Sequence, residues 1–189
     1  MKNLRIFTLF LPLLLLSACI DDEVPLPVPR ALTVDAVGFY CNMTVKDHPG
    51  PKGQIHQADS EKPLWFSSVR DAVAFTMLPD ETKDIAAIYV HDMGGGRDWK
   101  HPSDDSWIEA RDAWFVIHSR RRGGMGLTEA VPFAHEGEAL AFTDEYGGRV
   151  VPWHEIPHDY ILNAGVPNHD SDHADGNAVD GTEGKHHDG

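Results

Sequence analysis

Positive charge is scarce in this chain. Sixteen lysines and arginines stand against thirty aspartates and glutamates, and the formal net charge is −14 at neutral pH. Such an acidic chain is a poor partner for nucleic acid and a better one for cations. The chain also lacks the G-x-S-x-G, H-E-x-x-H and Rossmann glycine patterns of common enzyme classes. We therefore expect a protein that is not an enzyme.

Long apolar runs are also missing, apart from residues 6–16 near the N-terminus. This run is shorter than the roughly 20 residues that span a bilayer, and it follows two basic residues, as in a secretory signal. The next letters, "LSAC", resemble a bacterial lipobox and predict a signal peptide at 1–18 with lipid attached to Cys19. The alternative is an ordinary signal with an incidental cysteine. Ile20 stands where an inner-membrane retention aspartate is usual, which favours the outer membrane.

The composition divides the rest of the chain into three parts. The alternating prolines of residues 19–30 predict a semi-rigid spacer after the lipidated cysteine. Residues 31–167 are long enough for one compact body with a core. Residues 168–189 have almost no large apolar side chains and are predicted to be disordered. Histidines in this tail are candidates for weak binding of a second, divalent metal: His169, His173, His186 and His187.

Periodicity predicts an α+β body. Helices are expected at 67–78 and 136–146, and strands at 86–91, 113–119 and 150–153. Ser68 and Asp71 suit a capping box at the start of the first helix. Gly147 and Gly148 suit the C-terminal end of the second helix.

The two predicted helices belong to segments that match at a constant offset of 67 residues. Three matches keep this offset: Phe66 with Phe133, "AVAFT" (72–76) with "ALAFT" (139–143), and His91-Asp92 with His158-Asp159. This register predicts an internal duplication that forms two related lobes, at about 31–100 and 101–167.

Soft metal donors gather in "YCNMTVKDH", which contains Cys41, Met43 and His48. A thiolate and a thioether together select Cu(I) over Zn(II). On an extended stretch, Cys41 and Met43 would point to the same side, so that one ion could engage both. Lipidation of Cys19 would leave Cys41 as the only free thiol, which in an oxidising compartment calls for an explanation. Alternatives are a buried, inert Cys41 and Met43 in a core strand, or pairing of Cys41 with another molecule.

A further methionine, Met125, lies among three glycines in "RRRGGMG". Glycines at these positions predict a mobile backbone and an accessible thioether. The alternative is a loop in which Met125 is incidental. The arginines at 120–122 form a basic spot that is either a solvated face or a docking patch. His91 and Met93 form a second soft pair, for which we expect packing roles at the end of a strand and in a loop.

Several motifs in the same order resemble the NosL family. They are "CNM", "DHPGPKGQI" (47–55), "DSWIEARDAWFV" (105–116), "RGGMG" followed by "EAVPFA" (122–126 and 129–134), and "EYGGRVV" (145–151). The resemblance covers roughly residues 38–161, and the lipobox also fits this family of membrane-anchored periplasmic lipoproteins.

The resemblance implies a Cu(I) chaperone that supplies nitrous oxide reductase and works with an ABC-type maturation complex. It also implies two ββαβ-type lobes similar to those of organomercurial lyase, in agreement with the duplication. Cys41 and Met43 match the copper-binding C-x-M of the family. Met125 matches the methionine of its glycine-rich stretch, and His48 matches the histidine of D-H-P-G-P-K. The histidine-rich tail is not part of the family pattern.

Two rival functions stay open at this point. A copper sensor or storage lipoprotein would use the same site without delivering the metal. A thiol enzyme would need Cys41 with a lowered pKa and a positioned base. His48 and His118 are candidates for that base, but no third, orienting group can be identified.

Overall fold

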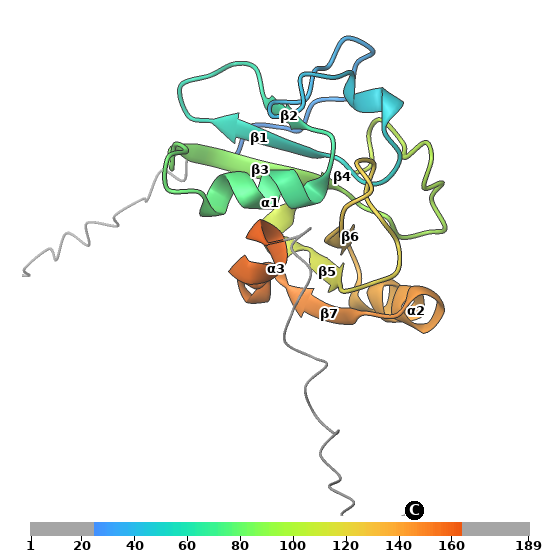
Figure 1. The fold of residues 1–189 in the computed structure, drawn as a ribbon. Coiled ribbons are helices and arrows are strands. Elements are labelled where there is room, and N and C mark those ends of the chain that lie inside the picture. Colours follow the sequence, from blue (N-terminus) through green and yellow to red (C-terminus); the bar gives the residue numbers. More distant parts are fainter. Residues whose placement is uncertain (1–24, 164–189) are drawn as a thin grey trace, which may run out of the picture.

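The computed structural model describes residues 25–163, which form two antiparallel sheets with helices packed beside them (Figure 1). The first sheet has the strand order β2-β1-β3-β4, and the second has the order β6-β5-β7. The strands are β1 Gly53–Gln57, β2 Leu64–Phe66, β3 Ile85–His91, β4 Trp107–Glu109, β5 Trp114–Ile117, β6 Val131–Phe133 and β7 Arg149–Pro152. The helices are α1 Val69–Met77, α2 Glu136–Tyr146 and α3 His158–Leu162.

The duplication is visible in the topology. Each lobe runs strand, strand, helix, strand, and in each the first strand lies in the centre, with β1 between β2 and β3, and β5 between β6 and β7. The predicted α+β class with two ββαβ-type lobes is therefore confirmed. Strand β4 adds a fourth strand to the first sheet, which therefore extends to Glu109, past the predicted lobe boundary near residue 100.

One of the three sequence matches does not mark equivalent structure. His91 ends the edge-to-edge strand β3, whereas His158 begins the short helix α3. The offset of 67 holds for β2 and β6 and for the starts of α1 and α2, but β7 begins three residues before the position that the offset assigns to the start of β3. The His-Asp match was therefore a wrong indication of equivalence, because the connection after α2 is shorter than the one after α1.

Local signals placed both long helices correctly. Ser68 Oγ accepts a hydrogen bond from the Asp71 backbone N–H at 3.1 Å, which is the predicted N-terminal cap of α1. Helix α2 ends at Gly147, which has a φ of 71° and donates its N–H to the carbonyl of Thr143. A left-handed residue at this position favours glycine because it has no Cβ.

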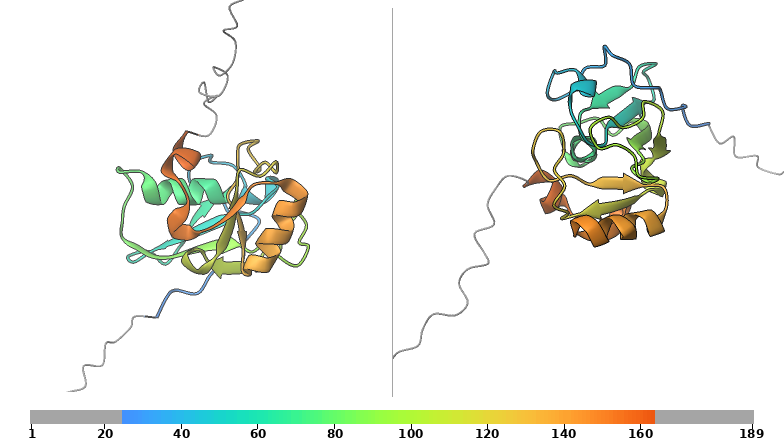
Figure 2. Two further views of the ribbon diagram at one scale, coloured as in Figure 1. Left: turned by 90° about the horizontal axis from the view of Figure 1, so that it is seen from below. Right: turned by 90° about the vertical axis from the view of Figure 1, so that its right-hand side faces the viewer.

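The two lobes share one hydrophobic core. Ile55, Phe66 and Phe75 of the first lobe belong to the same buried cluster as Phe115 and Tyr160 of the second. Helix α3, although it follows the second lobe, packs against α1 (Figures 1 and 2). The lobes are therefore repeats of topology that depend on each other for burial.

The end of the predicted spacer is attached to the first sheet. The Arg30 backbone and the Gln54 side chain exchange two hydrogen bonds of 2.9 Å, and the Tyr89 hydroxyl donates to the carbonyl of Pro27 at 2.8 Å. The folded body thus begins some residues before position 31. The predicted signal peptide, Cys19 and the histidine-rich tail lie outside the described residues. Within residues 25–163, no helix has both the length and the apolar character needed to cross a membrane.

Candidate metal centre

Cys41 and Met43 lie in a tight turn, so the expectation of an extended stretch was wrong. Val37 and Thr44 form an isolated antiparallel bridge, and the Gly38 N–H donates to the Met43 carbonyl at 2.9 Å. Asn42, between the two sulfur residues, has a φ of 53°. The left-handed residue reverses the chain, so Cys41 and Met43 flank the turn instead of alternating along a strand.

The thiol of Cys41 is held beside the start of α1. Its Sγ lies 3.2 Å from the hydroxyl Oγ of Ser67, a buried residue next to the helix cap. A Cβ on Gly38 would lie 2.5 Å from Cys41 Sγ and 2.8 Å from Ser67 Oγ. Only glycine therefore leaves room for this arrangement. Cys41 is half-buried and not in a disulfide, so its sulfur is positioned and still reachable.

Two aromatic residues attach the turn to the first lobe. The Phe39 ring lies 5.5 Å from that of Phe75 in α1, centroid to centroid, and the Phe39 N–H donates to the carbonyl of Trp65 at 2.7 Å. The Tyr40 hydroxyl donates to the Glu81 carboxylate at 2.8 Å. Burial, reinforced by this carboxylate, raises the pKa of Tyr40.

Met125 occupies the tip of a hairpin-like loop between β5 and β6. Arg122 and Thr128 form a bridge at its base, and its tip places 43% of the Met125 side chain in contact with solvent. Its glycines were predicted to provide mobility, but the structure gives two of them another role. A Cβ on Gly123 would lie 2.6 Å from Glu129 Oε2, and one on Gly124 would lie 2.6 Å from the His48 Cβ. These glycines allow close packing of the loop.

The turn and the hairpin meet at a cavity of about 250 Å³, which we call the Cys41 cavity. It is lined by Tyr40, Cys41, Ser68, Arg70, Asp71, Gly123, Met125, Leu127, Thr128 and Glu129. The structure thus brings Cys41 and Met125 to one cavity from different lobes. Met43 is 41% exposed on the other flank of the turn and does not line this cavity.

His48 faces elsewhere. Its ring lines a second cavity together with His91 and Lys52, and its Cβ packs against the Gly124 backbone. Within residues 25–163, His48 Nε2 is buried without a hydrogen-bond partner. The structure therefore places His48 behind the Met125 loop and does not bring its ring to the Cys41 cavity. Its role as a copper ligand stays a prediction.

Glu129 is a residue of the Cys41 cavity that the sequence reasoning missed. Its carboxyl group is fully buried, and burial raises its pKa to about 8. One oxygen accepts hydrogen bonds from the backbone N–H groups of Arg70 at 2.8 Å and Ala130 at 3.0 Å. The other oxygen has no partner among the described residues. No sequence pattern marks this residue, because its burial depends on α1 of the other lobe.

The donors present suit a soft metal ion. Among residues 25–163, no three His, Cys, Asp or Glu side chains are grouped so that they could hold a metal. That count leaves out methionine, and a thiolate with one or two thioethers is the donor set that selects Cu(I). A half-buried thiol and two partly exposed thioethers are also accessible for ligand exchange.

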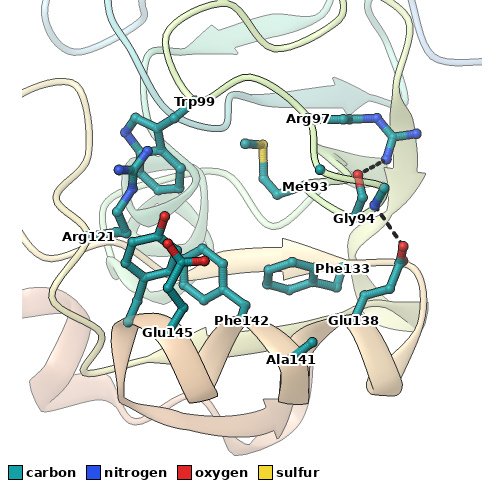
Figure 3. Close-up of a pocket in the computed structure, with 13 residues that line it drawn as sticks. Met93, Gly94, Arg97, Trp99, Arg121, Phe133, Glu138, Ala141, Phe142 and Glu145 are labelled. Carbon is teal, nitrogen blue, oxygen red and sulfur yellow. Dashed lines mark hydrogen bonds between the residues drawn. The ribbon is translucent and has the colours of Figure 1, made fainter.

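A further hollow of about 450 Å³ lies on the second lobe (Figure 3). Phe133 and Phe142 form its floor, and the Arg121 guanidinium stacks over Trp99 at 4.3 Å from the ring centroid. Met93 points into it but is only 6% exposed and packs in the core of this lobe. His91 lines a different cavity from Met93, which supports the expected packing roles of this pair.

The fold and the Cys41 cavity define a two-lobed α+β protein that presents thiol and thioether donors to one cavity. The chain belongs to the NosL family, whose model matches residues 29–161. It is 44% identical over 161 residues to a copper-binding lipoprotein NosL of Achromobacter cycloclastes, covering 85% of this chain and 83% of that one. A copper-binding lipoprotein NosL of Stutzerimonas stutzeri is 34% identical, covering 70% and 68% of the two chains.

A solved structure shows the same fold. The crystal structure of the copper chaperone NosL from Shewanella denitrificans has a TM-score of 0.66 and 34% sequence identity to this chain. It covers 71% of this chain, and the match includes 98% of that protein. These relatives are named as copper-binding lipoproteins and a copper chaperone, not as enzymes, in agreement with the non-enzymatic class predicted here.

Proposed function

We propose that this protein binds Cu(I) through Cys41, with thioether ligands from Met125 and Met43, and delivers it to a client. The observation that carries the proposal is that Cys41 and Met125 line one cavity, although they come from different lobes. Relatives with 34–44% identity are named as copper-binding lipoproteins, which supports the same cargo.

The exposure of the donors suits a carrier more than a permanent metal centre. Cys41 is the anionic ligand, and thioethers are neutral, weaker donors that add softness to the site. Met43 and Met125 are each more than 40% exposed, so a partner's ligands can replace them one at a time. Because the thiolate must lose its proton, the affinity for Cu(I) should fall in acid.

We further propose that the client is nitrous oxide reductase, loaded with help from an ABC-type maturation complex on the periplasmic side of the membrane. The name of the Shewanella denitrificans relative, a copper chaperone, supports delivery. The name lipoprotein, borne by two relatives, supports a lipid anchor at Cys19, for which we expect the outer membrane. Such an anchor keeps the carrier near membrane-bound partners and raises its effective concentration there.

The first test is an anaerobic Cu(I) titration of the mature lipoprotein in detergent against a competing chelator. Cys41→Ser should abolish tight binding, and Met125→Leu and Met43→Leu should weaken it, because each removes a sulfur at nearly constant volume. Met93→Leu is the matched control, since this buried thioether lies outside the Cys41 cavity. His48→Gln tests the fourth predicted ligand. Equal affinity in the parent and Cys41→Ser would refute the site.

The second test is transfer of the bound copper. Cu(I)-loaded protein is mixed with copper-free nitrous oxide reductase in membranes that contain the maturation complex, and copper in the reductase is measured. Transfer that depends on Cys41 supports a delivery role. Tight binding without transfer would instead indicate a copper sensor or storage protein.

A further inference from the structure

The cavity behind the Met125 loop has an unusual charge. It measures about 320 Å³, and we call it the His91 cavity. Its walls come from the segment before β1, the end of β3 and the loop that precedes β4. It is lined by Leu32, Lys46, His48, Lys52, His91, Lys100, His101, Pro102, Ser103 and Asp104. Three lysines and three histidines thus face one aspartate in a chain whose net charge is −14.

The single aspartate does not neutralise this cavity. Asp104 is already paired with Lys46, with 2.5 Å between Oδ2 and Nζ. Within residues 25–163, Lys52 and Lys100 form no ion pair with a carboxylate. The cavity therefore carries uncompensated positive charge at the end where Lys52, Lys100 and His91 meet.

Lys52 is the most unusual of these lysines because it is only 1% exposed. Its ammonium donates to the carbonyls of Pro49 at 3.1 Å and Gly50 at 2.6 Å, which leaves one of its three N–H donors free. Burial lowers the pKa of Lys52 to about 8. A buried charge held only by carbonyl groups is costly, and a negative ligand would reduce that cost.

His91 provides the second, independent observation. It is completely buried, and neither ring nitrogen has a hydrogen-bond partner among the described residues. Its ring stacks on Trp107 with 3.9 Å between centroids, which fixes its orientation. Burial, reinforced by the charge of Lys52, lowers the pKa of His91 to about 3, so that at neutral pH it is uncharged and offers one N–H donor. Buried polar atoms rarely stay without partners.

We propose that the His91 cavity binds a small oxyanion of the phosphate class, held by the ammonium groups of Lys52 and Lys100 and by the ring N–H of His91. The neighbouring ammonium groups disfavour a metal cation at this end of the cavity. The proposal is independent of copper binding, since Cys41 and Met125 line the other cavity. His48 borders the His91 cavity and can donate from its unpartnered nitrogen.

The test is calorimetric titration of the mature lipoprotein in detergent with sodium phosphate, at constant ionic strength maintained with sodium chloride. The parent should show one saturable site. His91→Phe keeps the ring packed on Trp107 and should weaken binding about tenfold, as should Lys100→Gln, since each removes one hydrogen bond to a charged ligand. Lys62→Gln is the matched control, because Lys62 is exposed and does not line this cavity.

Parallel titrations with sulfate and acetate distinguish a tetrahedral from a carboxylate ligand. Absence of saturable binding up to about 10 mM, or equal weakening by Lys62→Gln and Lys100→Gln, would overturn the proposal and leave a cavity filled by water. The affinity for Cu(I) should stay unchanged in His91→Phe, so that failure here is distinct from failure of the copper site.

Discussion

The two lobes have the same strand order but bury their helices to very different extents. Helix α1 buries Val69, Ala72, Val73 and Phe75, whereas α2 buries only Ala139. Helix α1 is covered by α3 and by the Cys41 turn, and α2 borders the open hollow of Figure 3. The first lobe therefore contributes more to the shared core, and the second leaves more of its helix to solvent.

The candidate site belongs to what the repeats do not share. The Cys41 turn precedes β1 and has no counterpart before β5. The Met125 hairpin occupies the connection between β5 and β6, from 118 to 130, whereas the equivalent connection between β1 and β2 covers only residues 58–63. The duplication thus supplies a scaffold, and two unrelated additions, one per lobe, meet across it. This explains why a duplicated fold presents one sulfur-lined cavity between its halves.

The largest expected difference between the lobes is at a pair of equivalent phenylalanines. Phe75 in α1 is 1% exposed and Phe142, 67 residues later in α2, is only half-buried. Phe75→Ala should lower the free energy of unfolding by roughly 3–5 kcal/mol, because it opens a cavity in the shared core. Phe142→Ala should cost about 1–2 kcal/mol, because much of its ring is already hydrated. Urea unfolding monitored by circular dichroism measures both.

Equal losses at the two positions would contradict the unequal burial of the lobes. Leu140→Ala is a useful control, since Leu140 is 51% exposed on α2 and should change stability little. A separate early transition in Phe142→Ala would show that the second lobe can unfold alone, against the continuous core.

The elements of the fold were predictable from the sequence because their signals are local. The helix at 136–146 was predicted with its observed bounds, and the cap at Ser68 was read from residues three apart. The duplicated topology followed from the matching helices. The fourth strand, β4, was missed, since Trp107–Glu109 is too short to show a strand period and is formed by pairing with β3.

The site was predictable only in its donor types. Cys41 and Met125 stood out because soft donors are rare in this acidic chain. The turn at Asn42 was not predicted, because a left-handed conformation at an asparagine depends on the bridge and hydrogen bonds around it. Glu129 and the His91 cavity depend on contacts between distant segments, and burial created by such contacts has no signature in neighbouring residues.

A second difference between the lobes lies at Glu129, whose counterpart 67 residues earlier is the exposed Lys62. The pKa of Glu129 is raised by burial from 4.5 to about 8. A raised pKa means that the folded state keeps a proton that the unfolded state loses, so the stability is full below pH 4.5 and declines as the pH rises towards 8. Glu129→Gln, which keeps the accepting oxygen, should remove this decline, about 3 kcal/mol between pH 4.5 and 7.

The measurement is the free energy of unfolding of the copper-free protein across this pH range, for the parent and the variant. Taking the difference between the two curves cancels other groups, including His91, which titrates in both. Glu61→Gln, on the exposed loop of the first lobe, controls for the loss of a surface carboxylate. Parallel curves for the parent and Glu129→Gln would show that the carboxyl group is ionised in the folded state.

The smallest expected difference is at the helix caps. Ser68 caps α1 through its hydroxyl, whereas His135, the equivalent residue before α2, makes no side-chain cap although its φ and ψ are also extended. Ser68→Ala should destabilise the protein by about 1 kcal/mol, and His135→Ser should stabilise it by up to about 1 kcal/mol, because a hydroxyl can accept from the free N–H groups of the first turn. His154→Ser, an exposed histidine outside any helix start, is the control. Urea midpoints that move in opposite directions would show that the second lobe lacks a cap its backbone can accept. A His135→Ser midpoint no higher than that of His154→Ser would instead show that the acidic first turn of α2, with Glu136 and Glu138, already satisfies this helix end.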